Sequence, residues 1–380
     1  MGIIQEQHPD RCRLFMQWKE MDWPILVDAL NLYGVSAVPI TYAIDEAGIV
    51  RAVNPKPAEF EAFLASPARE ASAPPPAARP DVAKMRPAEG PASAAEWGAY
   101  ADALFLWGGD ARRGGAIEAY ERALRLAPGD GPTEFRLGVA LRRRHDTAAR
   151  EPGDFQAAAR HWAAALESDP NQYIWRRRIQ QFGPRLDKPY PFYDWIEQAR
   201  AAVRARGEAP SPLVTEPSGS EIAAPAERFS GDDGGARPPD PAGRVRRDTE
   251  RLIRVDTAVV PSAIGPHGVT RVHLLLVPNA ALQAHWNNEA EPLRIWLDPP
   301  AGWRVDRREA RAPQPPTAVS TEPREIQFEL LAPAVLEGRP VEVPGYALYY
   351  VCEEADGVCL FRRQDFVLSV GVSGAPRPSP

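Results

Sequence analysis

The 380-residue chain is poor in cysteine and lysine, with only three cysteines, and it has no long apolar run. So few cysteines exclude a disulfide-rich scaffold. A membrane-spanning helix needs an unbroken apolar segment, so no part of this sequence is expected to span a membrane as a helix. The net charge of −6 argues against a nucleic-acid partner, which requires a concentrated positive surface, and nearly all basic residues are arginine.

Motifs for bound metals and cofactors are also missing. Zinc sites take four ligands, and the widely spaced His267, His273 and His285 have no ligand spacing. The sequence contains no Gly-rich phosphate loop, no Ser-His-Asp arrangement and no paired carboxylates of a hydrolase. We therefore predict no metal site and no cofactor.

Proline, in contrast, is abundant, with 42 residues concentrated in two segments that read as linkers. At 44% hydrophobic residues, the remaining segments are long enough to form cores. The predicted division is a partial α/β domain at 1–65, a Pro/Ala-rich linker at 66–93, a helical domain at 94–206, a disordered linker at 207–244, a β-sandwich at 245–372 and a disordered tail at 373–380.

Residues 94–206 contain an internal repeat with helical spacing. Ala116, Tyr120, Ala123 and Pro128 recur with the same offsets as Ala158, Trp162, Ala165 and Pro170. This small-aromatic-small-proline pattern resembles the second helix of a tetratricopeptide repeat, and Gly138 fits the close helix packing of the first helix. The resemblance implies a short α-solenoid with an insertion near 146–154.

Stacked helical repeats present a concave face that binds peptides or another domain. Trp162, Tyr173 and Trp175 are the candidate partner-binding residues on that face. The alternative is that these aromatic side chains cover the core of a short solenoid. A partner from within the same chain is favoured over a foreign protein.

Residues 245–372 alternate between apolar and polar residues, with turn residues between the stretches. This pattern predicts an antiparallel sandwich of immunoglobulin-like architecture. The expected strands lie at 251–255, 269–277, 293–297, 325–330, 346–351 and 361–370.

Cys352 and Cys359 bracket a short acidic loop between the last two expected strands. A hairpin places such residues opposite one another, near the separation that a disulfide needs. The sequence Tyr349-Tyr350-Val351-Cys352, an acidic loop and Cys359 resembles the N-terminal domain of the DsbD thiol-disulfide interchange family. That resemblance implies a cysteine pair, Cys352 and Cys359, that passes electrons between thioredoxin-like partners.

Acidic neighbours raise thiol pKa values, so Cys359, which precedes Phe361, Arg362 and Arg363, is the expected point of attack. A purely structural disulfide and a pair of unbridged thiols are the alternatives. An exchangeable pair and a reduction-resistant pair would be distinguished by reactivity.

Residues 1–65 contain a Val-Pro pair, two short strands and an acidic-Gly turn between them. This order resembles the thioredoxin-like fold of the TlpA, ResA and redoxin group, some of whose relatives carry selenocysteine. In that group the proline matching Pro39, with Val38 before it, is cis and shapes the substrate groove beside a Cys-x-x-Cys pair. Here that pair is absent, and Cys12 lies in the wrong element and reads as a small apolar residue.

A half-fold of this kind would expose an unpaired strand edge. The sequence therefore leads to the hypothesis that Met1 is an internal methionine, with a redox motif encoded upstream and a UGA codon read as a stop. The expected function is thiol-disulfide electron transfer with thioredoxin-like proteins or other protein segments, with weak or no activity from this chain alone. The alternative is a non-catalytic repeat scaffold. The DsbD resemblance implies the cell envelope, whereas the chain as it stands has no feature that directs it out of the cytoplasm.

Overall fold

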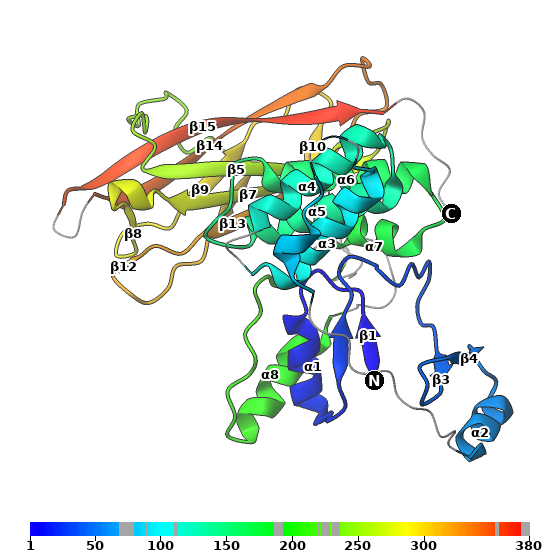
Figure 1. Ribbon diagram of the computed structural model, residues 1–380. Helices are drawn as coiled ribbons and strands as arrows, with labels where there is room; N and C mark the ends of the chain where they lie inside the picture. Colours follow the sequence, from blue (N-terminus) through cyan, green and yellow to red (C-terminus); the bar gives the residue numbers. More distant parts are fainter. Residues whose placement is uncertain are drawn as a thin grey trace.

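The computed structural model describes residues 1–67, 80–88, 90, 92–109, 113–185, 193–218, 221, 229, 236–353 and 357–373. Helices and several β-sheets are both present, which confirms a mixed α and β chain of several parts. Figure 1 shows a central group of helices, a long ribbon of β14 and β15, and a small hairpin with one helix that extends away from the rest. The end of the expected tail, 374–380, and much of both expected linkers lie outside the described residues.

Consecutive helices form the central group. They are α3 (Ala94–Trp107), α4 (Arg113–Leu126), α5 (Gly131–His145), α6 (Asp154–Ser168) and α7 (Tyr173–Phe182), and α8 (Trp195–Ala205) follows them. Ser93 and Glu96 form a capping box at the start of α3, and the Asp130 side chain accepts a hydrogen bond from the Thr133 N–H at the start of α5. Such caps satisfy backbone donors that have no partner within the helix.

The repeat found in the sequence marks the buried faces of α4 and α6. Tyr120 and Trp162 are both fully buried, as are the alanines one turn before them, Ala116 and Ala158. Gly138 on α5 makes the close approach possible, because a Cβ atom there would overlap the indole of Trp162. The expected role of Gly138 in helix packing is therefore confirmed.

The variant Gly138→Ala should lower the free energy of unfolding by about 1–3 kcal/mol, because the added methyl group overpacks the contact with Trp162. Urea titration followed by circular dichroism measures the change. Gly98→Ala is the matched control, since a Cβ on Gly98 in α3 meets no atom within 4 Å. The control should be more stable by about 0.5–1 kcal/mol; equal stability of the two variants would contradict the packing argument.

The N-terminal residues divide into two parts. The strands β1 (Gly2–Ile4) and β2 (Ile25–Val27) pair in parallel, with α1 (Asp10–Lys19) between them in sequence. The strands β3 (Tyr42–Ile44) and β4 (Val50–Val53) form the expected hairpin, whose turn is held by Asp45, and α2 (Pro57–Ala65) follows. The two strand pairs belong to separate sheets.

The first part packs on the helices. Leu14 of α1 packs against Ile196 and Ala199 of α8, and Leu30 joins the core of the central helical group. Arg11 forms a buried ion pair with Glu221, a residue of the segment expected to be a disordered linker. Composition predicted weak order for that segment, but a buried guanidinium needs a buried anion, and Glu221 supplies it.

Within the described residues, the C-terminal part contains eleven strands. They are β5 (Ile253–Val260), β6 (Ala263–Ile264), β7 (Val269–Pro278), β8 (His285–Asn287), β9 (Arg294–Leu297), β10 (Arg304–Val305), β11 (Glu309–Arg311), β12 (Val319–Ser320), β13 (Arg324–Leu331), β14 (Val341–Cys352) and β15 (Cys359–Val372). The six strands expected from the sequence all overlap strands of the structure. The short 3-10 helices Val82–Met85 and Ala280–Leu282 lie outside the sheets.

Two sheets enclose one apolar core. A four-stranded sheet has the order β10-β13-β7-β5, and a larger sheet has the order β11-β9-β14-β15-β6, to which β8 and β12 are added beside β14. Leu274 of β7, Phe328 of β13 and Tyr349 of β14 are among the fully buried residues between them. Apart from β6 on β15, which is parallel, the pairings within these two sheets are antiparallel.

The other face of the four-stranded sheet packs on the helices. Ala258 and Val260 of β5 belong to the core of the helical group, whereas Val259 between them belongs to the sandwich core. The Gln156 side chain of α6 receives the Val259 N–H at 2.8 Å and donates to the Val259 carbonyl oxygen at 3.5 Å. One amide thus takes the place of a neighbouring strand on the open edge of β5.

Stability should fall in mild acid because a histidine is buried at this interface. Burial, with the charge of Arg142, lowers the pKa of His145 to about 3. In the unfolded chain, histidine binds a proton near pH 6.5. The neutral, buried His145 therefore makes its full contribution to the free energy of unfolding above that pH, and this contribution is lost as the pH falls toward 3. From pH 7.5 to pH 5 it amounts to about 2 kcal/mol.

Urea titrations at pH 7.5 and pH 5 measure this difference. Acidification should lower the free energy of unfolding less in His145→Gln than in His267→Asn, and the difference should equal the full contribution of the buried imidazole. His267→Asn is the control, because His267 is exposed. An equal loss in both variants would show that His145 is not the group responsible.

Candidate functional site

The cysteine pair lies at the loop end of the β14–β15 hairpin, where β14 ends and β15 begins. Cys352 and Cys359 are the last pair of a register that begins at Val341 and Val370. Their sulfur atoms form a disulfide, and the Cα atoms lie 4.0 Å apart. The hairpin geometry expected from the sequence therefore brings the two cysteines together.

The two sulfur-bearing residues differ in access to solvent. Cys352 is 2% exposed, whereas Cys359 belongs to the exposed residues of the hairpin end. An attacking thiolate needs an approach in line with the S–S bond, so access determines which sulfur is attacked. Exposure therefore favours Cys359.

Aromatic side chains lie beside the disulfide on the same face of the sheet. Tyr350 and Phe361 are the facing pair two residues away, and their rings stack with centroids 4.6 Å apart. Phe361 is 37% exposed, and Val358, next to Cys359, is 68% exposed. Another protein that approaches Cys359 would contact this small apolar surface.

The neighbouring arginines do not act as the sequence suggested. Arg363 forms ion pairs with Asp240 at 2.9 Å and Asp365 at 2.7 Å, so its charge is already balanced. Arg362 faces Tyr349 in the register and lies on the opposite face of the strand from Cys359. The preference for Cys359 thus rests on exposure, and the expected help from arginine is not seen.

A histidine lies opposite the buried cysteine. The third strand of this region, β8, pairs with β14 so that His285 faces Cys352. Directly opposite residues of antiparallel strands share a face, with Cβ atoms about 4.5–5.5 Å apart. His285 Nδ1 lies 3.2 Å from the Gln283 carbonyl oxygen, which favours a proton on Nδ1.

In the sequence, His285 has no metal-ligand spacing, and nothing near it predicts a position opposite Cys352. Its relation to Cys352 depends on a strand pairing between positions far apart in the chain, for which the sequence contains no local signal. The only available sign was the alternation in residues 284–286, which a short strand produces.

The residues that the resemblance assigned to a substrate groove lie elsewhere. The Val38–Pro39 peptide bond is cis, as the resemblance implied, and both residues are exposed. Val38 and Tyr173 line one cavity of about 420 Å³. Figure 1 places β3, which follows Pro39, on the opposite side of the molecule from the end of the β14–β15 ribbon, so this proline is not part of the disulfide site.

Two of the three candidate partner-binding aromatic residues are inside the protein. Trp162 is fully buried and stacks on Phe182, while Trp175 is buried and stacks on Phe135. Only Tyr173 is exposed, at 40%. The arrangement agrees with the alternative in which these rings fill the helical core.

The remaining cysteine has the character expected of a small apolar residue. Cys12 on α1 is half-buried, and burial, with the nearby charge of Glu6, raises the pKa of its thiol. A raised pKa lowers the thiolate fraction at neutral pH. Within the described ranges, no group of three or more His, Cys, Asp or Glu side chains is arranged to hold a metal ion, and no helix is long and apolar enough to cross a membrane.

Comparison with known proteins gives no family for this chain. No family model and no curated protein matches it. Among solved structures, AvmM, described as catalysing macrocyclization in alchivemycin A biosynthesis, is 14% identical and has a TM-score of 0.19, with 35% of this chain and 97% of that chain covered.

Two further solved structures are similar to about the same fraction of this chain. The sporulation control protein Spo0M from Bacillus subtilis is 12% identical, with a TM-score of 0.18, covering 33% of this chain and 50% of that one. BslA, described as a bacterial hydrophobin, is 9% identical, with a TM-score of 0.17, covering 32% and 96%.

Proposed function

We propose that the chain exchanges its Cys352–Cys359 disulfide with the thiols of a thioredoxin-like partner. The observation that carries this proposal is the unequal burial of the two cysteines at the loop end of the hairpin, with Cys359 exposed and Cys352 buried. In the same proposal, the sandwich is an immunoglobulin-like domain similar to the N-terminal domain of DsbD. The helices are a tetratricopeptide-like spacer, and residues 1–65 are part of a thioredoxin-like domain.

The reaction begins when a partner thiolate attacks Cys359 Sγ. A mixed disulfide forms, the bond between the two cysteines breaks, and Cys352 leaves with the electron pair. A second thiolate of the partner then attacks its own sulfur in the mixed disulfide and releases Cys359. The cysteine pair ends as two thiols, and the partner ends with a disulfide.

The scaffold alternative has weaker support. A repeat surface for a foreign partner requires exposed aromatic residues, and Trp162 and Trp175 lie in the core. The helices instead contact the chain's own β5 through Gln156. The helices therefore dock against another part of the same chain.

Measurement of the reduction potential across a glutathione series tests the proposal. We expect a value between about −120 and −270 mV, the range of exchange catalysts, whereas a value below about −300 mV marks a structural disulfide. A thioredoxin variant that retains only its attacking cysteine should also form a mixed disulfide with the oxidised full chain. Peptide mass analysis should locate this bond at Cys359, and a bond at Cys352 would contradict the proposed direction of attack.

His285 is proposed to protonate the departing Cys352 thiolate. The rate of exchange should therefore be lower in His285→Gln than in the unchanged chain. About a tenfold loss is expected, below the usual effect of a general acid, because thiolates already leave readily.

The rates are measured with the same partner under the same conditions, so the reactivity of the partner's own thiol affects each variant equally. His267→Asn is the control and should keep the unchanged rate. An equal exchange rate for His285→Gln and the unchanged chain would contradict the proposed role of His285.

A further inference from the structure

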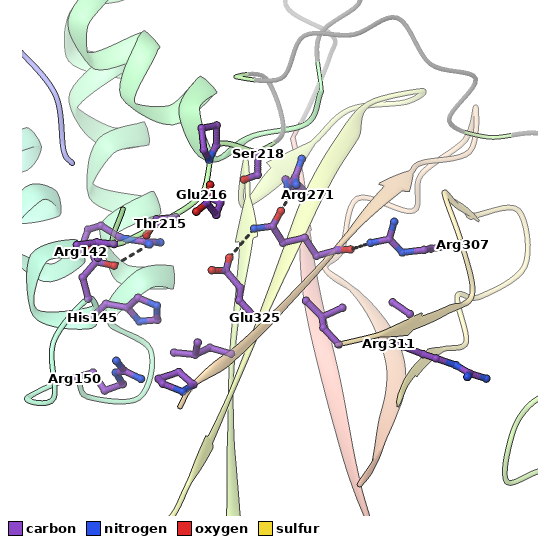
Figure 2. A pocket seen from close by; sticks show the side chains of 18 of the residues that line it. Arg142, His145, Arg150, Thr215, Glu216, Ser218, Arg271, Arg307, Arg311 and Glu325 are labelled. Carbon is purple, nitrogen blue, oxygen red and sulfur yellow. Dashed lines mark hydrogen bonds and ion pairs between the residues drawn. The ribbon is translucent and has the colours of Figure 1, made fainter. Parts of the chain in front are cut away.

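A partner that reacts with Cys359 needs a docking surface beside that residue. The cavity of about 790 Å³ between α5 and the four-stranded sheet does not provide one, because neither cysteine of the disulfide lines it. Figure 2 shows that this cavity is lined from both the helices and the sandwich, with Glu325 among arginines that include Arg142 and Arg271. The surface next to Cys359 is instead the outer edge of β15.

Every second residue of β15 directs its backbone N–H and C=O away from β14, as alternate residues of a strand do. The Arg363 N–H donates to the Arg246 carbonyl oxygen at 2.9 Å, and the Arg363 carbonyl oxygen accepts the Asp248 N–H at 2.9 Å. The register between β14 and β15 has no break. Cys359 and Phe361 therefore direct their own backbone groups toward the same outer edge.

These outward groups are open at the loop end of the strand. Among the described residues, the N–H groups of Cys359 and Phe361 have no acceptor, and the Phe361 carbonyl oxygen accepts the side chain of adjacent Arg362 at 3.3 Å. Figure 1 shows this end of the β14–β15 ribbon extending beyond the neighbouring strands. An unpaired edge of this kind can pair with an extended segment of another chain.

The chain's own residues 245–248 already use the next part of this edge. Residue 247 pairs in parallel with Arg363, outside the named strands. Just before it, Val245 packs on the face of the larger sheet that is turned away from the sandwich core, against Trp296, Tyr346 and Leu348. Tyr350 and Phe361 continue that face toward the disulfide, and Phe361 is still 37% exposed. Both the edge and the face are thus covered as far as Arg363 and open beyond it.

We propose, on the basis of the exchange reaction above, that the thioredoxin-like partner adds an extended segment to the open edge of β15 at Cys359 and Phe361. Strand addition gives affinity through main-chain hydrogen bonds, which do not depend on the partner's side chains. The stacked rings of Tyr350 and Phe361 add an apolar contact on the adjoining face. The added segment lies beside the exposed cysteine, so the same contact that binds the partner also places its thiolate near Cys359.

Proline at position 361 tests the proposal, because it removes a backbone N–H that points away from β14. Phe361→Ala is the reference, since it lacks the ring but keeps the N–H. Reduced thioredoxin should reduce the oxidised full chain about five- to tenfold more slowly in Phe361→Pro than in Phe361→Ala, because a carbonyl oxygen of the partner loses its donor. Dithiothreitol has no main chain and should reduce both variants at the same rate.

Val367 supplies the matched control. It lies six residues farther along β15, directs its N–H to the same outer edge and is 54% exposed. Thioredoxin should reduce Val367→Pro and Val367→Ala at equal rates. A difference as large as that at position 361 would show that proline acts through the strand as a whole, and would overturn the proposal.

Hydrogen exchange provides a second measurement that does not require a proline. In Cys352→Ser, the remaining Cys359 can be joined by a disulfide either to a thioredoxin that retains only its attacking cysteine or to 2-mercaptoethanol. The Phe361 amide should exchange at least about tenfold more slowly in the thioredoxin adduct, whereas the Val367 amide should exchange equally in both.

The two proposals fail in different ways. Equal exchange of the Phe361 amide in the two adducts, or equal rates with thioredoxin for well-folded Phe361→Pro and Phe361→Ala, overturns the edge contact and leaves disulfide exchange intact. No reaction of the unchanged chain with thioredoxin overturns the proposed function, and the edge contact with it.

Discussion

The contact between α6 and the edge strand β5 is the constraint on which the arrangement of the whole chain depends. An edge strand presents backbone groups that need partners, and here a single side-chain amide, that of Gln156, receives one N–H and donates to one carbonyl oxygen. Nearby, the Gly153 N–H donates to Asp256 of the same strand. These bonds fix the helical layer against the sandwich.

Because of that contact, both faces of the four-stranded sheet are covered, one by the sandwich core and the other by the helices. Along β7, Val272 and Leu274 face the sandwich core, whereas Arg271 and His273 face the helices. His273 Nε2 lies 2.8 Å from the Phe182 carbonyl oxygen, so the polar side of the strand is partly satisfied by the helical group. A strand with apolar residues on one side and polar residues on the other ordinarily has one side in water.

This is why part of the fold was readable from sequence and part was not. The alternation in β7 and β13 predicted strands, and the helical spacing of the repeat around Tyr120 and Trp162 predicted helices; both predictions are confirmed. The same alternation marks Arg271 and His273 as solvent-facing, although both are buried. Burial of polar residues depends on which layer covers them, and no local pattern contains that information.

The candidate site was likewise predicted only in part from the sequence. Cys352 and Cys359 are close together in one hairpin, so short-range reasoning found the disulfide. His285 reaches Cys352 through a pairing between distant strands, and Trp162 was assigned to a binding surface because an aromatic residue on a helix has no sequence mark that separates core from surface. Contacts close in sequence were predicted, whereas those created by packing of separate layers were not.

Structural redundancy at the hairpin end supports an exchangeable disulfide over a purely structural one. A disulfide that closes so short a loop reduces the entropy of the unfolded chain by an amount worth only about 2–3 kcal/mol. The hairpin is already fixed by its long register and by Tyr349, whose hydroxyl donates to the buried carboxylate of Asp248. Asp248 in turn receives the N–H of Ile253 at the start of β5. In the proposed exchange the last pair of the hairpin opens, while these anchors, which lie inside the core, continue to hold the rest of the register.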